Sequence, residues 1–148
     1  MKTTLFTMIA AIALFLSVRA AKDLKTTDNS VKVAFADLPK KLEYDFNKPS
    51  VRDAYYKKLD ALAATVITDD YAVSLKGHAD GIGAYKYNWV LSDKRAVSVK
   101  DYLVSKGVAS DRIITTPFGS TVPIASNETA AGRQKNRRVE IELKKIGK

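Results

Sequence analysis

The sequence predicts an α+β domain built as a two-layer sandwich, in which helices pack on one face of a β-sheet. Several short stretches alternate apolar and polar residues, which is typical of half-buried strands, and two longer stretches repeat apolar residues at three- and four-residue steps, which is typical of amphipathic helices. These stretches follow the order strand, helix, strand, helix, strand, short helix, strand. A length of 148 residues, 46% hydrophobic and 28% charged, fits one domain with one core.

Residues 1–20 are predicted to be a secretory signal peptide. Lys2 gives a positive start, a nearly unbroken apolar run covers residues 5–18, and Val18 and Ala20 place small residues at the minus-three and minus-one positions of a cut after Ala20. A retained membrane anchor is the alternative, although the run is shorter than the roughly 20 residues of a membrane-spanning helix. We expect export, with no transmembrane anchor after cleavage.

Charge and cysteine content narrow the possible partners. Without Lys2 and Arg19 the exported chain carries 23 basic and 16 acidic side chains, a formal net charge of +7, which favours anionic partners but identifies none. Export makes nucleic acid the least expected of these partners. The chain has no cysteine, so its stability must come from the core rather than from disulfides. A bacterial lipoprotein carries its lipid on a cysteine directly after the signal peptide, and position 21 of this chain is alanine. We expect a soluble, released protein.

Residues 21–40 are predicted to form a flexible lead. Residues 21–30 are polar and without period, and a weak alternation over residues 31–35 indicates a short strand that ends before Pro39. The folded domain is expected to span residues 41–148.

The first half of this domain is predicted to be strand, helix, strand. Residues 41–46 alternate charged and apolar side chains and are predicted to form the first strand. Ser50 is a candidate N-cap for an amphipathic helix that continues to about Ile67. Residues 72–77 form the second strand, which ends at a glycine.

The second half repeats the alternation. Ser92 is predicted to cap a second helix, which ends at Lys106 and Gly107. A third strand over residues 111–116 leads into a long loop. A short helix is expected over residues 129–136, and the final strand over residues 139–143.

Asp80 and Arg95 are the most informative pair of side chains. Asp80 follows the second strand in a loop whose glycines permit turns. The spacing of these glycines matches neither the dinucleotide-binding fingerprint nor the P-loop. Arg95 is expected in the first turn of the second helix, where free backbone amides favour a ligand carboxylate. The pair could therefore hold a zwitterion, with an ammonium group at Asp80. Alternatively, the two side chains bond each other and fix the loop; their spacing does not decide between these readings.

A set of motifs in order along residues 41–143 resembles the peptidoglycan-binding domain of the OmpA family. The residues that carry the resemblance are Tyr44-Asp45-Phe46-Asn47, Gly77-His78-Ala79-Asp80, Tyr87-Asn88, Leu91-Ser92, Arg95-Ala96, Gly107-Val108, Phe118-Gly119, Pro123, Asn127, Thr129, Gly132-Arg133 and Asn136-Arg137-Arg138-Val139-Glu140-Ile141. The resemblance implies an OmpA-like fold with a mixed sheet, located in the periplasm in association with the cell wall or outer membrane. It also implies non-covalent binding of peptidoglycan, without a cofactor, metal or catalytic residue.

The resemblance also implies the ligand and its contacts. The ligand would be the diaminopimelate of the stem peptide, with Asp80 holding its ammonium group and Arg95 its carboxylate. Four further residues would line or shape the same crevice: Phe46, Asn47, Asn88 and Leu91. Arg138 resembles an arginine of the final strand that lies near this crevice. Because Arg137 and Arg138 must point to opposite faces of the sheet, at most one of them is expected to reach a ligand directly.

Two departures from the family pattern concern affinity and anchoring. Ala79 stands where the family usually has threonine, so one hydroxyl that could bond within the loop is missing. The family often attaches this domain to a barrel, a lipid or a transmembrane helix, and none of these is expected here after signal cleavage. A structural protein, or one that binds other envelope proteins without holding the wall, is therefore an alternative.

Other residues with chemical potential are weaker candidates. His78 is the single histidine and lacks the partners for a metal site or a proton relay, so a structural role is expected. Trp89 could stack on a sugar ring or simply pack. The glycosylation-type triplet at 127–129 is incidental in a bacterial family. A cell-wall hydrolase is disfavoured because Asp80 has no evident second carboxylate for glycoside cleavage.

Overall fold

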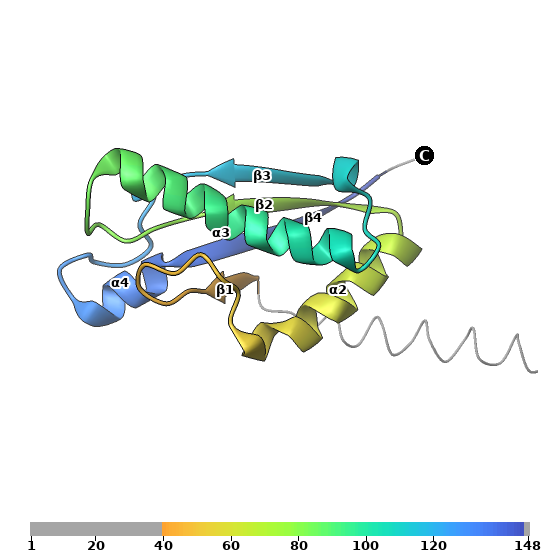
Figure 1. Ribbon diagram of the computed structural model, residues 1–148, viewed down its shortest axis with the longest axis horizontal. Coiled ribbons are helices and arrows are strands. Elements are labelled where there is room, and N and C mark those ends of the chain that lie inside the picture. Colours follow the sequence, from red (N-terminus) through yellow and green to blue (C-terminus); the bar gives the residue numbers. More distant parts are fainter. Residues whose placement is uncertain (1–39, 147–148) are drawn as a thin grey trace, which may run out of the picture.

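The computed structural model describes residues 40–146, and in this part of the chain helices and strands form two layers (Figure 1). The predicted signal peptide, and the lead with its weak strand up to residue 39, lie outside the described residues. The strands are β1 (Lys41–Glu43), β2 (Tyr71–Gly77), β3 (Ile113–Pro117) and β4 (Arg138–Lys145), and the helices are α2 (Tyr56–Thr68), α3 (Tyr85–Ser105) and α4 (Ala130–Asn136).

The strands form one mixed sheet in the order β1-β4-β2-β3. β2 runs parallel to β3, whereas β4 is antiparallel to both β1 and β2. The register places Gly77 opposite Val139 and Leu75 opposite Ile141, so these residues share one face of the sheet. The predicted α+β class and mixed sheet are confirmed.

α2 and α3 cover that face, and among residues 40–146 no helix covers the other face (Figure 1). The buried core is formed by the inward residues of the strands and the apolar stripes of both helices, and it includes Leu42, Leu59, Leu62, Val66, Val73, Leu75, Ala96, Val99, Leu103, Val139 and Ile141. Gly77 allows the end of β2 to approach α3 closely, because a Cβ there would lie 1.9 Å from the carbonyl oxygen of Ser92. The loop after β2 is thereby held against the first half of α3.

The start of α3 differs from the prediction. The helix begins at Tyr85, seven residues before Ser92, so Arg95 lies in its third turn rather than beside the free amides of an N-terminus. Ser92 is not a cap: its hydroxyl donates to the Trp89 carbonyl oxygen at 2.8 Å and accepts the Gly119 N–H at 2.9 Å. The polar signal at Ser92 therefore marks a tertiary contact.

The boundaries near β1 also differ. β1 ends at Glu43 because the chain turns over residues 45–48, where the Lys48 N–H donates to the Asp45 carbonyl oxygen and Asn47 has a φ of +56°. Ser50 does not cap the first helix, since a 3₁₀ turn at Asp53–Tyr55 precedes α2.

The short helix predicted near residues 129–136 is confirmed. Thr129 is its N-cap, and the Thr129 hydroxyl accepts the Gly132 N–H at 3.0 Å.

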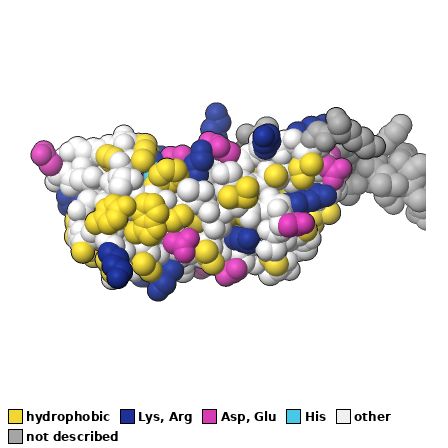
Figure 2. Space-filling view, turned by 90° about the horizontal axis from the view of Figure 1, so that it is seen from above, with side chains coloured by type: hydrophobic (Ala, Val, Ile, Leu, Met, Phe, Trp, Pro, Cys, Tyr) yellow, Lys and Arg dark blue, Asp and Glu magenta, His cyan; other side chains and the backbone are white. Residues whose placement is uncertain are grey.

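The surface is not uniform. Figure 2 shows hydrophobic side chains gathered on one face, toward the end of the molecule where α3 begins. Exposed apolar residues of the first turns of α3 include Tyr85, Trp89 and Val90. Within residues 40–146, no helix is both long and apolar enough to cross a membrane.

Candidate functional site

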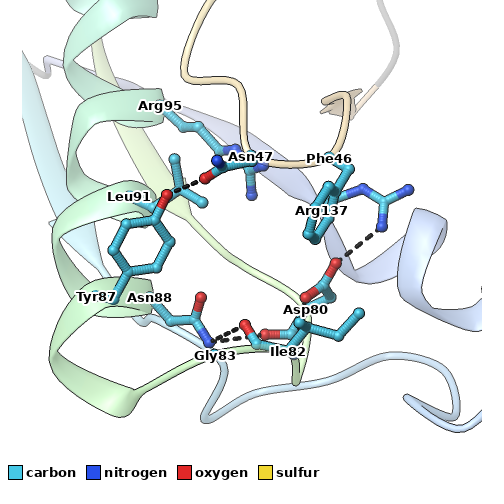
Figure 3. Close-up of a pocket in the computed structure, with 10 residues that line it drawn as sticks. All are labelled: Phe46, Asn47, Asp80, Ile82, Gly83, Tyr87, Asn88, Leu91, Arg95 and Arg137. Atoms are coloured by element: carbon cyan, nitrogen blue, oxygen red, sulfur yellow. Dashed lines mark hydrogen bonds and ion pairs between the residues drawn. The ribbon is translucent and has the colours of Figure 1, made fainter.

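A pocket of about 220 Å³ lies between the loop after β2, the first half of α3 and the turn after β1 (Figure 3). Its lining is Phe46, Asn47, Asp80, Ile82, Gly83, Tyr87, Asn88, Leu91, Arg95 and Arg137. Asp80 is the only carboxylate in this lining, and two arginines face it from different elements (Figure 3). The pocket therefore offers opposite charges within one small volume.

Arg95 is fully buried and bonds three backbone carbonyl oxygens in two segments, the turn after β1 and the end of β2. Its Nε donates to the Lys48 carbonyl oxygen at 3.0 Å, Nη1 to that of His78 at 2.9 Å, and Nη2 to that of Asp45 at 3.0 Å. Burial lowers the pKa of Arg95 to about 10, against the opposing influence of Tyr44 and Asp80, so the side chain remains a cation at neutral pH. Five N–H groups belong to a guanidinium, and three are used, which leaves one on each Nη atom.

Tyr44 supports Arg95 from the core side. Its ring lies 5.3 Å from the guanidinium carbon, and its hydroxyl donates to the Arg95 carbonyl oxygen at 3.2 Å. Burial raises the pKa of Tyr44 to about 12, so the hydroxyl stays protonated and can keep this donor role. A buried cation with a neutral aromatic neighbour retains its charge for the pocket.

Asp80 does not bond Arg95. Its Oδ1 accepts the Ile82 N–H at 2.9 Å, and its Oδ2 accepts Nη1 of Arg137 at 2.8 Å. The internal salt bridge considered from the sequence therefore forms with a different arginine. Since each carboxylate oxygen can accept about two hydrogen bonds, Asp80 keeps the capacity to accept from a ligand.

Asn88 and Asn127 hold the loop that carries Asp80. The Asn88 amide donates to the carbonyl oxygens of Asp80 and Ile82 at 3.2 and 3.0 Å, and the Gly81 N–H donates to Asn127 Oδ1 at 2.9 Å. Asn127 is itself held by the buried Asn136, whose Nδ2 donates to the same oxygen at 2.8 Å. The loop geometry thus depends on amides from three separate elements.

Ala79, the departure from the family pattern, is buried within this loop. Its N–H donates to the Gly119 carbonyl oxygen at 2.8 Å, and its side chain is 4% exposed. The loop is therefore bonded on both sides of Ala79 without a hydroxyl at this position.

Six of the seven predicted site residues line the pocket, and the seventh, Arg138, does not. Arg138 lies on the face of the sheet opposite to α2 and α3, where it pairs with Glu140 at 2.7 Å and donates to the Val122 carbonyl oxygen at 3.2 Å. Arg137 lines the pocket instead. The reason is alternation: Val139 points into the core, so Arg138 must point to the opposite face. The alternation of apolar residues in the last strand therefore already indicated that Arg138 points away from the core.

Sequence reasoning also missed Ile82, Gly83 and Tyr87 as lining residues. Tyr87 lies one helical turn before Leu91, and its hydroxyl donates to Asn47 Oδ1 across the pocket (Figure 3). Once α3 is known to begin at Tyr85, residues 87, 88, 91 and 95 fall on one helix face. The wrong helix start concealed this pattern.

His78 and Trp89 lie outside the pocket lining. His78 is 2% exposed and stacks on Phe118 with ring centroids 5.1 Å apart, and burial lowers its pKa to about 4. Trp89 is tilted against Tyr85 with ring centroids 5.9 Å apart. Among residues 40–146, no group of three or more histidine, aspartate or glutamate side chains could hold a metal ion.

Comparison with known proteins decides the family. Residues 43–137 match the model of the OmpA family. The chain belongs to the OmpA family. It is therefore a member of a family of binding domains rather than of enzymes, and the hydrolase alternative has no support.

Individual relatives agree with this assignment. Outer membrane protein A of Bordetella avium is 46% identical over 101 residues, which cover 68% of this chain and 52% of that protein. Peptidoglycan-binding protein ArfA of Mycobacterium tuberculosis is 53% identical over 72 residues, 49% of this chain and 22% of the relative. The chain thus matches about half or less of the length of these relatives, which are cell-envelope proteins by name.

A solved structure confirms the OmpA-like fold. The peptidoglycan-associated lipoprotein of Burkholderia pseudomallei superposes with a TM-score of 0.70 at 26% identity, covering 72% of this chain and 91% of that structure.

Proposed function

We propose that this protein binds peptidoglycan non-covalently by enclosing the zwitterionic end of a diaminopimelate side chain in the pocket. The observation that carries the proposal is the pairing of a carboxylate with a buried, carbonyl-bound arginine on opposite walls of one small cavity. Asp80 would accept hydrogen bonds from the ligand ammonium group, and Arg95 would donate its remaining N–H groups to the ligand carboxylate. Export to the periplasm is part of this proposal.

The remaining lining residues would shape the pocket rather than supply charge. Asn88 keeps the Asp80 loop in place, and Leu91 and Phe46 provide apolar walls for the ligand methylene groups. Asn47 would be the lining side chain that moves when the ligand binds. Because Arg95 has no exposed surface, a ligand carboxylate reaches it only after a lining side chain moves, and the Asn47 side chain is bonded only to Tyr87 among the described residues.

The test is co-sedimentation of the purified protein with sacculi that contain diaminopimelate. Asp80→Asn keeps the shape of the side chain and an oxygen for the Ile82 N–H but removes the charge. We expect at least about a tenfold loss of affinity, since removing one partner of a desolvated charged contact typically costs about 2–5 kcal/mol. Asp101→Asn, an equal charge change at an exposed position of α3, is the matched control and should bind as the parent does.

Isothermal titration with free meso-diaminopimelate then tests whether this compound binds without the rest of the wall. Equal binding by the parent protein and Asp80→Asn would contradict the site. Binding to sacculi without binding to diaminopimelate would favour a different wall ligand. No binding to either would favour the alternative of a protein that contacts other envelope proteins.

A further inference from the structure

A second hollow of about 230 Å³ continues from the pocket across one face of α4. It is lined by Phe46, Ile82, Ala130, Arg133 and Arg137. Three of these residues, Phe46, Ile82 and Arg137, also line the first pocket, so the two hollows are parts of one groove. Ala130, Arg133 and Arg137 are spaced by three and four residues and therefore share one face of α4 and its C-cap.

The two arginines of this hollow are in different electrostatic situations. All three nitrogens of the Arg137 guanidinium group have partners: Nη1 bonds Asp80, Nη2 bonds Gln134 Oε1 and Nε bonds the Tyr44 carbonyl oxygen. Its charge is balanced by Asp80 at 2.8 Å. Because its charge is already balanced, Arg137 attracts an anion less than an unpaired arginine would, although one N–H remains on each of its Nη atoms.

Arg133 is oriented but not neutralised. Its Nη1 donates to the carbonyl oxygens of Asn127 and Glu128 at 2.8 and 3.0 Å, which fixes the direction of the guanidinium plane. Within residues 40–146 no carboxylate lies within ion-pair distance of it, and its Nε and Nη2 atoms have no hydrogen-bond partner. A pre-oriented guanidinium group with free N–H donors is suited to a carboxylate.

The rest of the hollow favours part of a peptide. Phe46 and Ile82 are 57% and 47% exposed and flank the arginine with apolar surface. The net charge that the hollow presents is one positive charge, because Asp80 balances Arg137. A monoanionic group on a chain with apolar portions matches both features.

We propose that Arg133 forms a second, carboxylate-binding subsite, which holds an acidic residue of the same wall peptide next to the diaminopimelate. This inference rests on the proposed function. In wall peptides the glutamate that precedes diaminopimelate carries either a free α-carboxylate or a carboxamide. The subsite would therefore make the protein discriminate between the acid and amide forms.

The experiment is isothermal titration of the protein with three compounds: meso-diaminopimelate, the tripeptide Ala-γ-Glu-diaminopimelate, and the same tripeptide with the glutamate α-carboxyl amidated. We expect the acid tripeptide to bind about fivefold more tightly than the amide, at the upper end for a partly exposed ion pair. In Arg133→Gln this ratio should fall to less than twofold, while the affinity for free diaminopimelate stays unchanged. Lys135→Gln, an equal charge change at an exposed position of α4, should keep the fivefold ratio.

The outcomes separate the two proposals. If diaminopimelate binds but the parent protein does not distinguish acid from amide, or Arg133→Gln keeps the full ratio, the subsite is wrong and the proposed function stands. If none of the three compounds binds, the proposed function fails and the subsite with it. Arg133→Lys provides a second variant if the glutamine variant does not fold: it keeps the charge without the planar fork, and we expect a ratio of about twofold.

Discussion

Arg95 and Arg138 are both almost completely buried, but their charges are compensated in different ways. Arg95 donates to three backbone carbonyl oxygens and has no carboxylate within ion-pair distance among residues 40–146. Arg138 pairs with Glu140 at 2.7 Å on the face of the sheet that α2 and α3 leave open. The guanidinium charge of Arg95, held only by neutral dipoles, is available to an anionic ligand, whereas that of Arg138 is already neutralised by Glu140 and stabilises the fold.

Arg95 and Arg138 also differ in the segments of the chain that they connect. On the pocket side, Arg95 connects the turn after β1, the end of β2 and α3, so the ligand site and the tertiary structure share one side chain. On the open face, Arg138 bonds its near neighbour Glu140 and the loop at Val122. A substitution of Arg95 is therefore expected to affect both ligand binding and the stability of the fold.

The largest expected effect compares the two arginines directly. Arg95→Met removes the donor from the buried His78 carbonyl oxygen and from that of Lys48, and one of the two donors to that of Asp45, and it should lower the free energy of unfolding by about 3–5 kcal/mol. Arg138→Met should cost about 2 kcal/mol, because the Glu140 side chain is 34% exposed and can be hydrated. Denaturant unfolding followed by circular dichroism measures both values. Arg52→Met, which breaks the exposed pair with Asp45, is the control and should cost less than about 1 kcal/mol.

Equal destabilisation by Arg95→Met and Arg138→Met would contradict the comparison. It would mean that a carboxylate partner and three carbonyl partners hold a buried guanidinium group equally well. The sedimentation test does not depend on this outcome, because Asp80→Asn leaves the bonds of Arg95 intact.

A smaller effect is expected from pH on the open face. Burial, together with the charge of Arg138, lowers the pKa of His78 to about 4 from an ordinary value of 6.5. The unfolded chain therefore takes up a proton near pH 6.5 and the folded protein only near pH 4. The stability associated with the neutral ring is complete above pH 6.5 and is lost as the pH falls toward 4, by up to about 3 kcal/mol.

His78→Phe tests this assignment, since phenylalanine can keep the stacking on Phe118 but cannot take up a proton. The free energy of unfolding of this variant should be nearly flat between pH 6.5 and 4.5, whereas that of the parent protein should decline. Parallel profiles for the two proteins would show that His78 does not cause the decline.

The order of elements and the pair Asp80 and Arg95 were predictable from local patterns, whereas the other lining residues that were predicted followed from the resemblance to the OmpA family. Alternation at Val139 and Ile141 identified the last strand, and the charges at Asp80 and Arg95 identified the pocket. The start of α3 was not predictable from Ser92, because a serine that bonds Trp89 and Gly119 within the fold has the same sequence signature as a cap. The Asp80–Arg137 pair joins residues 57 positions apart, and no local pattern specifies it.

The smallest expected effect comes from making Arg138 resemble Arg95. Burial acts to raise the pKa of Glu140, but the hydrogen bond and charge of Arg138 outweigh it and lower the pKa below the ordinary value. Glu140→Gln removes the compensating charge while keeping an oxygen that can accept from the guanidinium group, and it should cost about 1 kcal/mol at pH 7. Because Arg138 lies outside the pocket lining, the affinity for diaminopimelate should change by less than about twofold, as measured by isothermal titration. A larger change in affinity would show that the open face and the pocket are energetically coupled, and that the paired arginine contributes to binding as well as to the fold.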